Sequence, residues 1–144
     1  MYQIREMVIE DYDAVRALWE ATPGVSVRDA DSQASIARYL LRNPGLSFVA
    51  IQDDAVIGCA MSGHDGRRGY LQHVVVLPAL RRRGIANAMV ERTLAALEAL
   101  DICKSYLEVL CTNVEGAAYW ESRGWQRRDD ITRYSFIRNA GANC

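Results

Sequence analysis

Three consecutive arginines and a glycine stand where a strand-like run passes into a helix-like run. Val74, Val75 and Val76 form the strand-like run, and Arg81, Arg82, Arg83 and Gly84 precede the helix-like run that opens with Ile85, Ala86 and Asn87. The first N–H groups of a helix lack intrahelical partners, and the helix dipole adds partial positive charge there. A glycine lets a ligand approach the backbone, and arginines add charge beside the amides. The pattern predicts a site for a small anion such as pyrophosphate.

Other chemistries are excluded by pattern. The chain contains neither the GxxxxGK[ST] motif of a P-loop nor the GxGxxG fingerprint of a dinucleotide site. Its four cysteines show no CxxC pairing and its two histidines lack metal-ligand spacing, so we expect reduced thiols and no metal. A solvent-exposed helix start without a ligand is the alternative interpretation of the arginines.

Composition limits the class of protein. The 144 residues fit one domain, 1–144, and half of them are apolar, as in a globular fold. Seventeen basic against eighteen acidic residues leave a net charge of −1, which argues against a nucleic-acid partner. No apolar run approaches the roughly 18 residues that span a bilayer, and no apolar leader is present. We therefore expect a soluble, cytoplasmic protein with no membrane partner.

The elements that must position these residues follow from periodicity and turn residues. Helices are predicted over 10–20, 31–43 (with Asp31 as N-cap), 83–100 and 115–123. Strands are predicted over 3–7, 47–52, 56–63, 70–77, 105–111, 125–129 and 133–137. The strand–helix–strand order over 70–111 predicts a parallel pair, whereas the hairpin before it is antiparallel. The fold class is therefore α/β, with a mixed, mostly antiparallel twisted sheet of six to seven strands and about four helices.

The arginine-glycine stretch matches the R/Q-x-x-G-x-G/A signature, and the chain resembles the GNAT superfamily of acetyl-CoA-dependent N-acetyltransferases, in particular a small bacterial subgroup. The match continues upstream through V-x-P at Val76-Leu77-Pro78 and downstream through EVLCTNVEGAAYWESRGW. The resemblance implies the GNAT fold, with 70–77 and 105–111 as a central, splayed parallel pair. It also implies transfer of the acetyl group of acetyl-CoA to a primary amine of a small molecule or a protein.

The resemblance implies a pose for acetyl-CoA. The backbone of Val74, Val75 and Val76 would pair with the pantetheine arm, while the side chains of these valines pack in the core. The pyrophosphate would lie on the turn formed by Arg81, Arg82, Arg83, Gly84, Ile85, Ala86 and Asn87. Asn113 matches a position that contacts the cofactor near its thiol end. A helix N-cap is the other interpretation of Asn113, and both can hold at once.

Amine acetylation needs a base that deprotonates the acceptor. Glu108 is our first candidate, because it matches the glutamate used as base in alanine acetyltransferases that modify ribosomal proteins. His73 is the rival on the cofactor strand, since imidazole titrates near neutrality. A bound water is the third option. The backbone N–H of Val76 is, by analogy with the family, the donor to the oxyanion.

At the position of the residue that protonates the thiolate leaving group, this sequence differs from the family pattern. The position seven residues after Asn113, where many members carry tyrosine, is Trp120, whose indole N–H is no general acid. Tyr119 is adjacent but lies about 100° away around a helix. Three possibilities remain open for the proton donor: Tyr119, a water, or no strong acid at all. The last is possible because a thiol is a good leaving group. A covalent route through Cys59 or Cys111 is disfavoured, since neither has a basic neighbour in sequence.

The acceptor is not determined by the sequence. Asp29, Asp31, Asp129 and Asp130 could attract a cationic amine, whereas Arg28, Arg127 and Arg128 could bind a carboxylate. The main hypothesis is an acetyltransferase, and the alternative is a non-catalytic acyl-CoA sensor that the missing tyrosine keeps open. The resemblance also implies a homodimer as one assembly of such domains.

Overall fold

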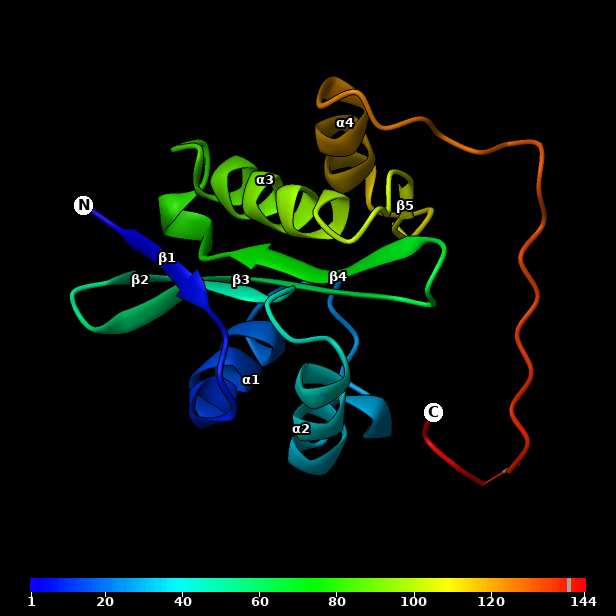
Figure 1. Ribbon diagram of the computed structural model, residues 1–144, viewed down its shortest axis with the longest axis horizontal. Helices are drawn as coiled ribbons and strands as arrows, with labels where there is room; N and C mark the ends of the chain where they lie inside the picture. The colour runs from blue at the N-terminus through cyan, green and yellow to red at the C-terminus, as the bar shows by residue number, and fades with distance from the viewer. Residues whose placement is uncertain (140) are drawn as a thin grey trace. The chain divides into compact units, whose positions relative to one another are not determined.

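The strands pair in the order in which they follow one another along the chain. The computed structural model describes residues 1–139 and 141–144. Its strands are β1 (Gln3–Glu6), β2 (Phe48–Gln52), β3 (Ala55–His64), β4 (Gly69–Val76) and β5 (Ser105–Tyr106). Pairings from β1 to β4 are antiparallel, and β5 joins β4 in parallel. The expected mixed, mostly antiparallel sheet is confirmed (Figure 1).

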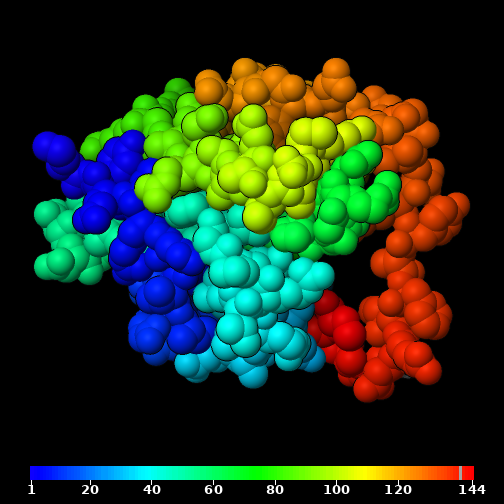
Figure 2. Space-filling view, in the orientation of Figure 1, coloured from blue at the N-terminus to red at the C-terminus, as the bar shows by residue number. Residues whose placement is uncertain are grey.

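Four α-helices are found in the described residues, as predicted. They are α1 (Tyr12–Glu20), α2 (Gln33–Arg42), α3 (Ile85–Glu98) and α4 (Val114–Ser122), with short 3₁₀ turns η1 (Ile9–Asp11), η2 (Asp29–Asp31) and η3 (Pro78–Leu80). Within residues 1–107, α3 covers one face of the sheet and α1 and α2 cover the other (Figures 1 and 2).

Two apolar clusters fill the space between these helices and the sheet. On the side of α1 and α2, Val15, Trp19 and Ile36 are buried together with residues of β2, β3 and β4. On the side of α3, Ile85 and Met89 pack against the sheet. The amphipathic spacing of the helices therefore places their apolar faces on the sheet, as periodicity predicts.

The chain divides into two compact units, residues 1–107 and residues 108–144. The first contains the five strands and α1 to α3. The second contains α4, in which the Trp120 ring meets Tyr119 and Trp125 edge-on at centroid distances of 5.0 and 5.1 Å. The prediction of one domain over 1–144 therefore stays a prediction.

The expected strand count is wrong. The described residues form a five-stranded sheet, not one of six to seven strands. The ranges 125–129 and 133–137 form no strand, and the range 105–111 forms one only at Ser105–Tyr106. The parallel pair consequently lies at one edge of the sheet and not at its centre.

The physical reason is that a strand needs a neighbour for its backbone hydrogen bonds, and alternation alone does not supply one. Residues 126–139 are all exposed, including Tyr134 and Phe136, each with 89 % of its surface accessible. Among the residues described, the alternating apolar side chains of this segment are therefore not buried.

Two helix starts also differ from the prediction. The N-cap of α2 is Ser32, whose hydroxyl accepts from the Ser35 N–H, because the Asp31 carboxylate instead accepts from the Arg28 N–H within η2. The third helix begins at Ile85 and not at residue 83, because Gly84 has a left-handed backbone with φ of 79°.

In the part of the chain that the structure describes, no helix is long and apolar enough to cross a membrane. The same residues hold no group of three or more His, Cys, Asp or Glu side chains arranged to bind a metal ion.

Candidate functional site

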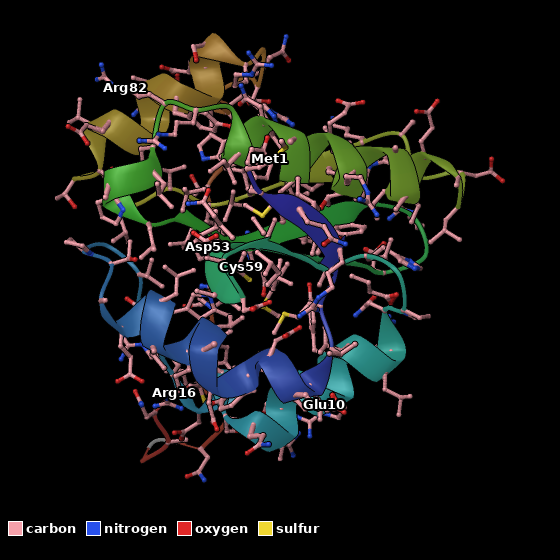
Figure 3. All side chains as sticks on the ribbon, turned by 90° about the vertical axis from the view of Figure 1, so that its left-hand side faces the viewer. Met1, Glu10, Arg16, Asp53, Cys59 and Arg82 are labelled. Atoms are coloured by element: carbon pink, nitrogen blue, oxygen red, sulfur yellow. The ribbon has the colours of Figure 1, made fainter. Side chains whose placement is uncertain are left out.

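The turn before α3 has an unusual backbone. Arg82 and Gly84 both have positive φ, at 64° and 79°, with Arg83 between them. Alternation of left-handed and other residues aims successive amides toward one side and makes a concave nest for an anion. A Cβ added at Gly84 would meet nothing within 4 Å, so the space above this glycine is open. Arg82 lies on this turn (Figure 3), and Arg81, Arg82 and Arg83 are exposed around it.

The first turn of α3 adds further donors. The earliest intrahelical bond runs from the Ala88 N–H to the Gly84 carbonyl, at 3.0 Å. The N–H groups of Ile85 and Ala86 lie before this bond, in the first turn of the helix, where N–H groups lack an intrahelical partner. Together with the positive end of the dipole, they favour an anion at this position.

The edge of β4 changes character along its length. Its parallel pairing with β5 is confined to Gly69 with Ser105 and Tyr70 with Tyr106, although β4 continues to Val76. The Leu77 N–H donates to the Ile57 carbonyl of β3 at 2.9 Å. Because backbone groups alternate in direction along a strand, the N–H of Val76 faces away from β3. The Val76 carbonyl accepts from Arg81 Nε at 3.4 Å, which ties this edge to the arginine turn.

The valine side chains are used for packing. Val75 is buried in the cluster under α1 and α2, whereas Val74 and Val76 belong to the cluster under α3. A ligand at this strand would therefore meet main-chain groups.

Three predicted site residues lie in the 108–144 unit. The Glu108 carboxylate is 66 % exposed and forms an ion pair with Arg133 at 2.8 Å. The Asn113 side chain accepts from the Gly116 N–H at 2.9 Å, so the N-cap role is confirmed. Tyr119 is half-buried, and burial raises the pKa of its phenol, with a smaller opposing effect from Arg123.

One pairing was not foreseen from the sequence. His73 Nε2 and Asp31 Oδ1 lie 2.8 Å apart, and the His73 ring stacks on Trp19 at a centroid distance of 4.4 Å. Forty-two residues separate His73 from Asp31, so no local pattern connects them. The weak signal was a histidine directly before the valine run from Val74 to Val76.

Cys59 is not suited to nucleophilic chemistry. Its side chain is fully buried, and burial raises the pKa of its thiol to about 12. The thiol is therefore protonated near neutral pH, whereas the thiolate is the nucleophile.

Known proteins resemble this chain in sequence and in fold. The family model described as the acetyltransferase (GNAT) family matches residues 12–125. An acetyltransferase of Pectobacterium atrosepticum is 33 % identical over 130 residues, which cover 90 % of this chain and 92 % of that protein.

Two solved structures share the fold. The PaiA N-acetyltransferase of Thermoplasma acidophilum has a TM-score of 0.81 at 16 % identity, with 91 % of this chain and 93 % of that chain covered. The aminoglycoside N-acetyltransferase AAC(6')-Iy has a TM-score of 0.74 at 20 % identity, with 95 % and 99 % covered. The matched family and the identity to its relative together show that this chain belongs to the acetyltransferase (GNAT) family and is an acyltransferase.

Proposed function

We propose that this protein transfers the acetyl group of acetyl-CoA to a primary amine, of a small molecule or of a protein, by direct attack with the assistance of a general base. The observation that carries the proposal is the turn before α3. Its left-handed Arg82 and Gly84, the open space above Gly84 and three exposed arginines fit the pyrophosphate of CoA.

The edge of β4 supports the same proposal. A pantetheine arm carries two amides, and the backbone of Val74, Val75 and Val76 would pair with them where β5 no longer does. The N–H of Val76 would then donate to the carbonyl oxygen of the acetyl group as negative charge develops on it. Asn113 would contact the cofactor near its thiol end.

The choice of an amine acceptor draws on the structural neighbours. The PaiA structure is a complex with coenzyme A, and the AAC(6')-Iy structure is a complex with a bisubstrate analogue of CoA and acetylneamine. The acceptor of the present chain is proposed to belong to the same broad class, primary amines.

Two proton transfers accompany this reaction. The acceptor ammonium must lose a proton before its nitrogen can attack, and Glu108, His73 or a bound water would take it. The thiolate must gain a proton, which Tyr119 or a water would provide. A non-catalytic sensor is not favoured, because the matched family and its named relatives are acetyltransferases. We propose a homodimer as the assembly, which light scattering would separate from a 16.1 kDa monomer.

Gly84→Val tests the pyrophosphate site that we propose in the turn before α3. A side chain at this position would occupy the open space that we assign to the pyrophosphate, so calorimetry should show CoA affinity reduced by tenfold or more, about 1.4 kcal/mol. Gly66→Val is the matched control, because Gly66 also has positive φ and open surroundings but lies in another loop. Both variants carry similar backbone strain, and only the first should lose affinity. Unchanged CoA binding in Gly84→Val would overturn the assignment of this turn as the pyrophosphate site.

Turnover is tested separately with acetyl-CoA and a panel of primary amines. The panel would contain benzylamine, putrescine, glycine methyl ester and a peptide with an N-terminal alanine. Released CoA should be measured by chromatography, because Cys103, Cys111 and Cys144 are exposed and would consume a thiol reagent. Binding of CoA without acetylation of any amine would contradict the proposed activity.

A further inference from the structure

His73 occupies a strained position in the strand that we assign to the pantetheine arm. Cys59 pairs with Val75 and Met61 pairs with Gln72, so His73 and Val74 both stand opposite Ala60 in a β-bulge. The φ of His73 is 49°, which is uncommon for a residue other than glycine. Such a conformation is strained and persists only where its surroundings determine it. Bulges often re-aim a side chain beside an active site.

Contacts from two other elements hold the imidazole. Trp19 of α1 stacks on the ring at 4.4 Å with an interplanar angle of 34°. Asp31 of η2 lies 2.8 Å from Nε2, and the side chains of His73 and Asp31 are only 18 % and 11 % exposed. Stacking on one side and a hydrogen bond on one edge leave the ring little freedom to rotate.

Hydrogen bonds hold both the carboxylate and the main-chain carbonyl of Asp31. Its Oδ2 accepts from the Arg28 N–H at 3.0 Å, and its main-chain carbonyl accepts from the Tyr12 hydroxyl at 2.6 Å. Arg16 in turn donates to the Tyr12 hydroxyl at 2.8 Å. Because the backbone occupies Oδ2, the Oδ1 atom is directed to His73.

This arrangement selects one tautomer of the imidazole. An ionised carboxylate only accepts hydrogen bonds, so Nε2 must carry the hydrogen. Nδ1 then carries the lone pair. An imidazole that donates to a carboxylate through one nitrogen can accept a proton at the other, and this is the arrangement that general bases use.

We propose that His73 is the general base of the acetyl transfer and that Asp31 is its positioning residue, an inference that rests on the proposed function. Nδ1 takes one proton from the acceptor ammonium and later returns it to water. The lone pair of the neutral amine forms the C–N bond to the acetyl carbon, and the C–S bond breaks with its electron pair on sulfur. The second proton lost by the amine nitrogen reaches the thiolate, so that an amide and free CoA result.

The contacts of Glu108 make it the weaker candidate. Its carboxylate is 66 % exposed and already paired with the Arg133 guanidinium at 2.8 Å. The ion pair occupies this carboxylate with a structural partner. His73, in contrast, lies on the same strand as Val76, whose N–H we assign to the acetyl oxygen.

Asparagine at position 73 provides the first test. Asparagine tolerates positive φ and its amide can still donate to Asp31, but it does not accept a proton at neutral pH. His73→Asn should lower kcat by about 100-fold or more, the usual contribution of a general base, with CoA affinity changed less than twofold. The fall of kcat/KM on the acid side of the pH profile should disappear. Glu108→Gln is the control and should keep that part of the profile.

Asp31→Asn tests the positioning role. Its single carbonyl oxygen would accept from Arg28, which turns the amide N–H₂ toward Nε2 and forces the imidazole hydrogen onto Nδ1. We expect kcat to fall by about tenfold or more with KM for the amine little changed. Asp13→Asn, an exposed carboxylate on α1, should match the wild type. Beside Asp31, the elements around His73 also carry Tyr12, Arg16 and Cys59, and these three groups remain in each of these variants.

His73→Gly separates chemistry from folding, since glycine suits the positive φ. Added imidazole should restore turnover to His73→Gly and not to Asp31→Asn. Wild-type kcat and pH profile in His73→Asn, or no rescue of His73→Gly, would overturn the assignment of the base alone. A wild-type protein that acetylates no amine in the panel would overturn the proposed function together with this inference.

Discussion

At the scale of single residues, the left-handed backbone at Arg82 and Gly84 is the basis of the anion site that we propose. The two φ values of 64° and 79° bracket Arg83, and the open space above Gly84 leaves room for a ligand. Net charge of −1 means that this concentration of arginine is local. Because a nest and a helix start act together here, a compact anion should bind more strongly than an extended polyanion.

Burial also separates the four cysteines by reactivity. Cys59 is buried with a pKa raised to about 12, whereas Cys103, Cys111 and Cys144 are exposed. A chromogenic disulfide reagent at pH 8 should therefore titrate three thiols rapidly and the fourth only after unfolding in urea. Rapid reaction of all four thiols in the native protein would contradict the burial of Cys59, and Cys59→Ser should leave the rapid count at three.

At the scale of elements, α4 depends on its cap. The Asn113 side chain accepts from the Gly116 N–H at 2.9 Å. Asn113→Ala should destabilise the helix by about 1 kcal/mol in urea unfolding, whereas Asn113→Asp keeps the acceptor and the stability. Both variants remove the side-chain N–H donor. Weaker CoA binding in both would support the proposed contact with the cofactor, and weaker binding in Asn113→Ala alone would assign Asn113 to capping only.

The parallel pair depends on the absence of a side chain at Gly69. A Cβ there would lie 2.5 Å from Ser105 Oγ and 2.9 Å from Leu97 Cδ1. Gly69→Ala should therefore crowd the side chains of Ser105 and Leu97 and lower the free energy of unfolding by about 1–3 kcal/mol. Gln72→Ala, at an exposed position of the same strand, should change it by less than about 0.5 kcal/mol. Equal stabilities would contradict the close approach.

At the scale of the whole molecule, acid stability should depend on Asp11. Arg5 donates twice to this carboxylate at 2.8 Å and, with the Val8 N–H, lowers its pKa below the ordinary value of 3.8. A lowered pKa in the folded state contributes stability that is complete above about pH 4 and lost as the pH falls through the folded value. Asp11→Asn should reduce stability at pH 7 and flatten this acid dependence in urea unfolding. Asp13→Asn, exposed on α1, should do neither.

The division at residue 107 raises the question of cooperativity, and we predict one domain. In Trp19→Phe, the remaining tryptophans, Trp120 and Trp125, both report on residues 108–144, whereas far-ultraviolet circular dichroism reports mainly on the helices and strands of residues 1–107. A single domain requires that both signals change at the same urea concentration. Two separate midpoints would establish two independently unfolding domains.

Most of the element order could be predicted from local patterns. The periodicity that places Val15, Leu18 and Trp19 on one face of α1 acts within a few residues, and the structure buries all three. Gly124, which follows the helix predicted over 115–123, has positive φ. The strands predicted over 125–137 failed because alternation describes only which face a strand would bury, and a strand also requires a partner.

The sequence by itself determined the family, because the motif from Arg81 to Ala86 depends on a short stretch of backbone whose conformation follows from local residue types. Only the tertiary structure decided that His73 and Asp31 form a pair, that Trp19 stacks on the imidazole, and that Glu108 is paired with Arg133. The physical reason is that proton transfer depends on distances between side chains. Those distances are set by the packing of α1 and η2 against β4, which no local pattern contains.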